Sequence, residues 1–406
     1  MRIAKGLSGS VAVRGHHPWA SSALRGRGAE EGEGTVAAKG MGLALAALLA
    51  LATACAGQNA PLLIGMDVTP TVPPPSPTVI PSPSPTPACN DPAAGRAAAA
   101  PATVQVVAGT TAGSGVAVAP HGRVVTAYRL VRDHVLVSLL LPDGRKAVGQ
   151  VVAWDEASDL ALVAAMLDGL PTVRWAPAEP VPGDQLLALG YPFPSQHGLG
   201  GQPTVTAAVA RRPVEASGQK YISLGTDLNE GYSGGPVVDL CGRLVGLVLA
   251  RLGDGGEAAL SLASARPIVE RLAATPTPSL GPEESALAAN MATVLREGYL
   301  PSGRYAAVTA ASERFYGLHG ICLDSPDSYC QKVLFFLGTR YLGADTQRPS
   351  RLILDVTPGE RPGEVVVIYA SYAPGDPDCC PTGQPVPIPY YWDGQRLRPG
   401  GVPPGH

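Results

Sequence analysis

The sequence predicts an all-β domain over residues 102–274, followed by a small α+β domain over residues 283–406. Short β-prone runs fill the first segment, separated by Gly, Pro or Asp-Gly, and few helical patterns interrupt them. Many short strands with turn signals indicate a barrel or a sandwich. SARPIVERLA at 264–273 predicts a closing helix capped by Ser264. The expected strand runs are TVQVV, GSGVAVA, RVVTA, HVLVSLLL, KAVGQVVAW, DLALVAA, DQLLALG, TVTAAVA, GPVVDL and RLVGLVLA.

The second segment begins with an amphipathic helix. Leu287, Met291, Val294 and Leu295 recur at helical spacing, and Gly298 stands where the helix should be capped. Strand-like runs follow, so a mixed α+β domain is expected. These runs are QKVLFFL, RLILDV, EVVVIYAS and VPIPYYW.

The composition bounds the class of protein. Its 406 residues have room for two domains plus tails, and 45% apolar content supports a core. The formal charge of −3 and the lack of a Lys/Arg block argue against nucleic acid as the main partner. No cofactor is expected.

The N-terminus, residues 1–55, is interpreted as an export leader. The uncharged apolar run 41–55 is short for a bilayer-spanning helix and fits a signal peptide. The residues 51–54 before Cys55 resemble a bacterial lipobox, which implies lipidation of Cys55 and anchoring to a membrane outside the cytoplasm. An uncleaved short anchor is the alternative, and Met41 is an alternative start.

Two linkers separate the predicted units. Residues 56–101 include TPTVPPPSPTVIPSPSPTP and an alanine-rich tail, which predict an extended, polyproline-like spacer. Residues 275–282, TPTPSLGP, form the second linker.

Outside the cytoplasm, cysteines are expected to form disulfides. Without Cys55 six remain, which allow fifteen pairings. Cys379 and Cys380 are neighbours with Cα atoms ~3.8 Å apart, below the usual disulfide window of ~4.4–6.8 Å. They are therefore expected to bond elsewhere, with Cys322 and Cys330 as the natural partners.

By elimination, Cys89 and Cys241 are left to bond to each other. No CxxC spacing or histidine companion accompanies the cysteines, so no metal site is expected.

The stretch NEGYSGGPVVD at 229–239 carries a candidate nucleophile, Ser233. The flanking glycines allow a tight turn that exposes the hydroxyl. The backbone N–H groups of Gly231 and Ser233 would then converge as an oxyanion hole. A plain glycine turn between strands is the alternative.

The order of motifs around this serine resembles the trypsin-like serine protease domain, and the HtrA/Deg branch most of all. The stretches that carry the likeness span about 170 residues, and the resemblance implies two six-stranded β-barrels with a cleft between them. They are GSGVAVAPHGRVVTAYRLV, DEASDLALV, LGYPF, TVTAAVARR and GYSGGPVVDLCGRLVGL.

The resemblance assigns the nucleophile to Ser233 and the orienting acid to Asp159. The position of the general-base histidine, in VVTAYRLV, holds Arg129. A general base must accept a proton near neutral pH, which a guanidinium cannot do. Loss of the base costs a serine protease about 10⁶ in kcat, and a forked pair between Arg129 and Asp159 would fill the same space.

No other residue is an obvious substitute for the base. His134 is the histidine nearest in sequence but opens the next strand, no lysine lies within 103–145, and the ordinary pKa of Tyr128 is too high. Asp227 has two readings: the acid of a specificity pocket for basic side chains, or a structural aspartate.

The C-terminal region resembles the LppP/LprE lipoprotein domain more loosely, over about 75 residues, and no activity comes with this likeness. The stretches are KVLFFLGTRYLG, EVVVIYASYAP and IPYYWDGQRL. A PDZ domain, the usual companion in the HtrA branch, is not evident.

Three hypotheses follow. The first is an exported, lipid-anchored pseudoprotease whose cleft binds a peptide or unfolded protein segment without cutting it. The second is an active serine endopeptidase that uses Ser233 with a non-standard base. The third is a docking or structural lipoprotein of the cell envelope.

Overall fold

The computed structural model describes residues 89–119, 123–192, 199–251, 257–325 and 329–404. The expected leader, Cys55 and the proline-rich part of the first linker lie outside these residues. Among the helices described, none has the length and apolar character needed to span a bilayer.

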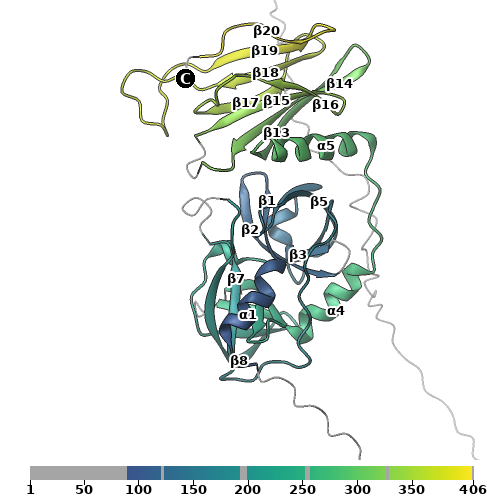
Figure 1. Cartoon of the computed structure of the whole chain (residues 1–406), viewed down its shortest axis with the longest axis vertical. Helices are drawn as coiled ribbons and strands as arrows, with labels where there is room; N and C mark the ends of the chain where they lie inside the picture. Colours follow the sequence, from purple (N-terminus) through teal and green to yellow (C-terminus); the bar gives the residue numbers. More distant parts are fainter. Residues whose placement is uncertain (1–88, 120–122, 193–198, 252–256, 326–328, 405–406) are drawn as a thin grey trace, which may run out of the picture. The chain divides into compact units, whose positions relative to one another are not determined.

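The first barrel is a closed sheet of six antiparallel strands in the order β1-β2-β3-β6-β5-β4. Strands β1, β2, β3 and β5 of this barrel are labelled in Figure 1. Short Val-, Leu- and Ala-rich runs form it, because such side chains fit the interior of a small barrel. Its strands are β1 (Thr103–Ala108), β2 (Thr111–Ala119), β3 (Arg123–Ala127), β4 (Leu136–Leu140), β5 (Lys146–Asp155) and β6 (Leu160–Ala165).

The second barrel has the same form, in the order β10-β11-β12-β9-β8-β7. The expected all-β double barrel is therefore confirmed. Its strands are β7 (Gln185–Gly190), β8 (Thr204–Ala216), β9 (Gln219–Leu224), β10 (Pro236–Asp239), β11 (Leu244–Arg251) and β12 (Glu257–Ser261).

Two helical turns interrupt the barrels where the candidate site lies. Helix α2 (Tyr128–Val131) follows β3 directly, and the 3₁₀ turn η2 (Glu230–Tyr232) ends one residue before Ser233.

The helices that flank the barrels differ from expectation at two points. The alanine-rich end of the first linker is not extended: α1 (Pro92–Ala99) and the 3₁₀ turn η1 (Ala100–Ala102) form there. Asp91 caps α1 by accepting from the N–H of Ala93 at 2.9 Å. The closing helix α4 (Leu262–Ala273) begins two residues before Ser264, so Ser264 is not its cap. The hydroxyl of Ser264 instead accepts a hydrogen bond from the N–H of Lys220.

The C-terminal domain consists of helix α5 (Pro282–Arg296) and two four-stranded antiparallel sheets. The helix pattern is confirmed, and Gly298 follows the helix with φ +89°. A buried aromatic and aliphatic core that includes Phe315, Phe335 and Tyr390 joins strands of both sheets. The strands are β13 (Tyr299–Ala310), β14 (Glu313–Cys322), β15 (Gln331–Leu337), β16 (Arg340–Ala344), β17 (Ile353–Pro358), β18 (Glu364–Tyr369), β19 (Val386–Trp392) and β20 (Leu397–Pro399).

Disulfides pair all six cysteines of the described part. Cys89 bonds to Cys241, as expected, and ties the start of α1 to the turn between β10 and β11.

The prediction that Cys379 and Cys380 bond to Cys322 and Cys330 is wrong. Cys322 bonds to Cys330, and the neighbours Cys379 and Cys380 bond to each other with Cα atoms 3.8 Å apart. Cys322 ends β14 and Cys330 directly precedes β15, and these two strands pair with each other, so the β14–β15 hairpin places the two cysteines side by side.

Candidate active site

Three segments of the two barrels meet at the candidate site. Arg129 lies in α2, Asp159 lies in the turn before β6, and Ser233 lies between η2 and β10. The cleft has a volume of ≈ 560 Å³, and both Arg129 and Ser233 line it.

Asp159 is held in an unusual backbone conformation with φ +54°. Aspartate tolerates this left-handed region better than most residues. Its carbonyl accepts from the N–H of Tyr128 at 2.9 Å, and its Oδ1 accepts from the N–H of Arg129 at 2.8 Å. The turn before β6 and the start of α2 are therefore fixed to each other through the candidate acid.

The turn that carries Ser233 depends on Gly234, whose φ is +84°. A Cβ at this position would overlap the carbonyl oxygen of Ser114, so only glycine fits. The carbonyl of Ser233 accepts from the N–H of Ser114 at 2.9 Å. These contacts fix the backbone while the serine side chain faces the cleft.

The guanidinium of Arg129 occupies the space between the acid and the nucleophile. Its Nη1 forms an ion pair with Oδ2 of Asp159 and donates to the carbonyl of Leu249 at 2.8 Å. Its Nη2 donates to Oγ of Ser233 at 2.7 Å. Only one guanidinium nitrogen meets Asp159, so the expected pair forms but is not forked.

The environment keeps this cation in place without neutralising it. Burial lowers the pKa of Arg129 from its ordinary value, and the charge of Glu230 opposes that shift. An arginine side chain has no neutral form at physiological pH, so the group next to Ser233 is a donor and cannot take the serine proton.

The two N–H groups expected to form an oxyanion hole are satisfied within their own turn. The N–H of Gly231 donates to Oδ1 of Asn229 at 3.1 Å, and the N–H of Ser233 donates to the carbonyl of Glu230 at 3.0 Å. An oxyanion needs donors that are free to reach it. In this conformation the turn does not present that pair of donors.

The other candidates from the sequence are not among the residues that line the cleft. Asp227 is exposed and is not part of its lining. Among the histidines that the structure describes, neither His134 nor His319 lines the cleft. Burial lowers the pKa of His134, and the pKa of His319 falls to about 4 for the same reason.

Sequence patterns missed several residues of the site. Glu230, Glu257, Arg132 and Leu249 all line the cleft. Glu257 is only 6% exposed. In the sequence, Glu257 is recognisable only as an acidic residue at the start of the short apolar run EAALS. Its place in the cleft depends on how the second barrel closes.

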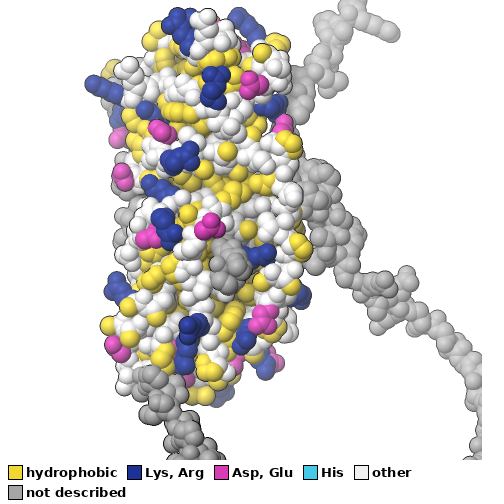
Figure 2. Space-filling model, turned by 45° about the vertical axis from the view of Figure 1, so that its right-hand side comes forward, with side chains coloured by type: hydrophobic (Ala, Val, Ile, Leu, Met, Phe, Trp, Pro, Cys, Tyr) yellow, Lys and Arg dark blue, Asp and Glu magenta, His cyan; other side chains and the backbone are white. Residues whose placement is uncertain are grey.

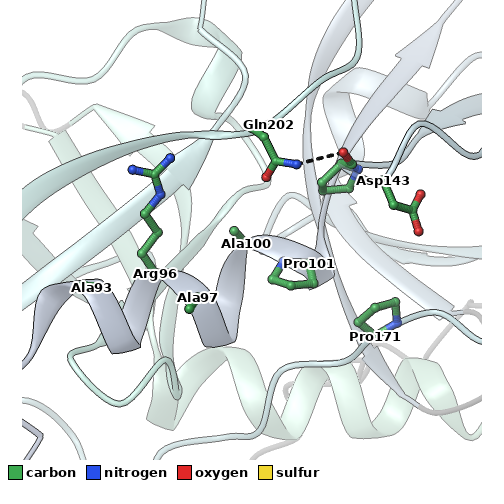
Figure 3. A pocket seen from close by; sticks show the side chains of 9 residues that line it. Ala93, Arg96, Ala97, Ala100, Pro101, Asp143, Pro171 and Gln202 are labelled. Carbon is green, nitrogen blue, oxygen red and sulfur yellow. Dashed lines mark hydrogen bonds between the residues drawn. The ribbon is translucent and has the colours of Figure 1, made fainter.

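A second hollow, of ≈ 340 Å³, lies beside α1 (Figure 3). Alanine and proline side chains form most of it, and Gln202 Nε2 donates to the carbonyl of Pro142 at 2.9 Å. Its lining holds no Ser, Cys or His, so it offers no nucleophile or base.

On the face shown in Figure 2, basic and acidic side chains are interspersed.

Two protein-family models match parts of this chain. A model of the trypsin-like peptidase domain matches residues 113–247, and a model of the LppP/LprE lipoprotein family matches residues 320–395.

Two curated relatives cover the first of these regions. The periplasmic serine endoprotease DegP of Escherichia coli K12 is 33% identical over 167 residues, which are 39% of this chain and 34% of the relative. A probable periplasmic DegP-like serine endoprotease of Chlamydia trachomatis is 30% identical over 155 residues, 36% of this chain and 29% of the relative. The chain spans about a third of the length of these relatives.

Among solved structures, the inactive form of the Rv3671c protease is 26% identical, with a TM-score of 0.41 over 48% of this chain and all of that one. The active form of the same protease, from M. tuberculosis, has a TM-score of 0.40 over 52% of this chain and 97% of that one. The double barrel and the matched segment together identify residues 113–247 as a trypsin-like serine peptidase domain of the HtrA/Deg type, with an LppP/LprE lipoprotein region after it.

Proposed function

We propose that this protein is a pseudoprotease: an exported, lipid-anchored member of the trypsin-like group whose cleft binds peptide segments without cutting them. The observation that carries the proposal is the contact of Arg129 with both Asp159 and Ser233. These are the two groups between which a general base would have to work.

The chemistry of acyl transfer argues for inactivity at this site. Attack by Ser233 requires loss of its proton to a neighbouring acceptor. The neighbour is instead a cation that already donates to Oγ. The turn also directs the N–H groups of Gly231 and Ser233 inward, so a tetrahedral intermediate would lack both its base and its oxyanion donors.

The cleft itself remains suitable for a peptide. Its volume of ≈ 560 Å³ is within the range of ligand pockets. Leu130, Val248 and Leu249 supply apolar surface, and charged side chains of both signs lie beside them. Lipidation at Cys55 would place the domain outside the cytoplasm, where its named relatives are periplasmic.

The test uses the purified full chain, a fluorophosphonate probe and casein. The parent is expected to show neither labelling of Ser233 nor cleavage. Arg129→His is expected to gain labelling, because an imidazole is a competent base at neutral pH. Ser233→Ala in the same background is the control, and labelling of the parent at the rate of Arg129→His would overturn the proposal.

An active endopeptidase with a non-standard base is the second candidate. The observation that favours it is the preserved turn, in which Gly234 keeps φ +84° and Ser233 faces the cleft. Casein cleavage by the parent that disappears in Ser233→Ala would establish this alternative.

A further inference from the structure

The hydrogen bonds of Arg129 leave part of its guanidinium unused. A guanidinium has five N–H donors. The two protons on Nη1 go to Asp159 and Leu249, and one proton on Nη2 goes to Ser233. Among the described residues, Nε and the second Nη2 proton have no acceptor, and the side chain is 49% exposed.

Ser233 adds another donor at the same place. Its Oγ accepts from Nη2 of Arg129, so the hydroxyl proton must point elsewhere. No acceptor for that proton occurs in the part of the chain that the structure describes. Both side chains line the cleft, so a ligand bound in it would lie next to these unpaired donors.

Three backbone groups at the site that an extended peptide could use are already engaged within the protein. The carbonyl of Leu249 already accepts from Arg129 at 2.8 Å. The N–H groups of Gly231 and Ser233 donate within their own turn. A chain passing through would therefore find these three partners occupied, whereas a ligand that only accepts hydrogen bonds would find open donors.

We propose that the cleft captures the free C-terminal carboxylate of a peptide, bound by Nη2 of Arg129 and by Oγ of Ser233. A carboxylate accepts from several donors at once and pairs with guanidinium better than a neutral carbonyl does. This inference rests on the proposed peptide-binding function and narrows its ligand. It gives the retained serine a role as a binding residue.

Acidic side chains on the cleft wall oppose part of this attraction. Glu230 and Glu257 line the cleft together with Arg132. Glu230 lies close enough to Arg129 to act on its charge. Removing the charge of Glu230 should therefore strengthen carboxylate binding, the opposite of removing the charge of Arg129.

The experiment measures fluorescence polarisation of two fluorescein-labelled hexapeptide mixtures of equal composition with the full chain. One mixture ends in free carboxylates and the other in amides. We expect the carboxylate mixture to bind at least tenfold more tightly. Arg129→Gln and Ser233→Ala should each remove most of this preference, Glu230→Gln should increase it, and thermal melts confirm that each variant folds.

The outcomes separate the two proposals. Equal binding of both mixtures would overturn carboxylate capture but leave peptide binding intact. Binding of neither mixture would overturn both. Displacement of the peptides by an equimolar amount of acetate would show that a bare carboxylate suffices, and so would overturn capture of a peptide end.

Discussion

Nη2 of Arg129 lies 2.7 Å from Oγ of Ser233 and donates a hydrogen bond to it. In a working serine peptidase the group at this place takes a proton from the serine. Here the direction of the hydrogen bond is reversed. The same guanidinium also holds Asp159 and Leu249, so one side chain connects the acid, the nucleophile and strand β11.

Arg129→Gln is expected to lower the free energy of unfolding by about 1–2 kcal/mol, because it removes a charged hydrogen-bond partner from Asp159. Arg132→Gln is the matched control: its ion pair with Asp133 joins two exposed side chains, and such pairs contribute little. Urea unfolding of both variants measures the difference, and equal losses would contradict a structural role for Arg129.

Because the turn before Ser233 engages the N–H of Gly231, we expect that replacing Arg129 by histidine does not by itself give full activity. In Arg129→His, Asn229→Ala should release the N–H of Gly231 and raise casein turnover about tenfold or more, since one oxyanion donor contributes about 10²–10³. Asn229→Ala alone should remain inactive. If the double variant Arg129→His/Asn229→Ala cleaves casein no faster than Arg129→His, the N–H of Gly231 becomes available without removal of the Asn229 side chain.

The strands of the first domain were largely predictable. All ten expected runs are strands, because their Val- and Leu-rich stretches are bounded by turn residues. The pattern missed β9 and β12, whose sequences QKYISL and EAALS lack that character. Both become strands because barrel closure supplies their partners.

The candidate site was predictable only where a motif marks it. The glycine turn marks Ser233, and the resemblance to the trypsin-like domain assigns the positions of Asp159 and Arg129. The contact of Arg129 with Leu249 depends on how the two barrels meet, and 120 residues separate the pair. The internal use of the Gly231 N–H depends on the rotamer of Asn229, which no spacing rule specifies.

The buried His319 is expected to lower the free energy of unfolding in acid. It is 1% exposed and lies between Ser302 and Gln331, and burial lowers its pKa to about 4. An unfolded histidine has a pKa of about 6.5, so the unfolded state binds the proton first. The stabilisation is complete above about pH 6.5 and falls by about 3 kcal/mol as the pH drops to about 4.

Urea unfolding between pH 4 and 8 tests this dependence. His319→Gln keeps a polar side chain but cannot titrate, so the difference between parent and variant should change across that window. A difference that stays constant with pH would contradict a neutral buried imidazole.

Ser114 joins the first barrel to the nucleophile turn through a buried hydroxyl. Its Oγ donates to the carbonyl of Gly231 at 2.6 Å and accepts from the N–H of Tyr191 at 2.9 Å. Ser114→Ala leaves both backbone groups without this partner, so the free energy of unfolding should fall by about 2–3 kcal/mol.

Ser138 provides the matched control, because it is equally buried but its hydroxyl has no hydrogen-bond partner in the described structure. Ser138→Ala removes a hydroxyl that is already unsatisfied, so its stability should be unchanged or higher. Chemical unfolding of the two variants side by side separates hydrogen bonding from burial. Equal effects would mean that the Ser114 hydroxyl does not hold the turn, and the fixed position of Ser233 against Arg129 would then need another cause.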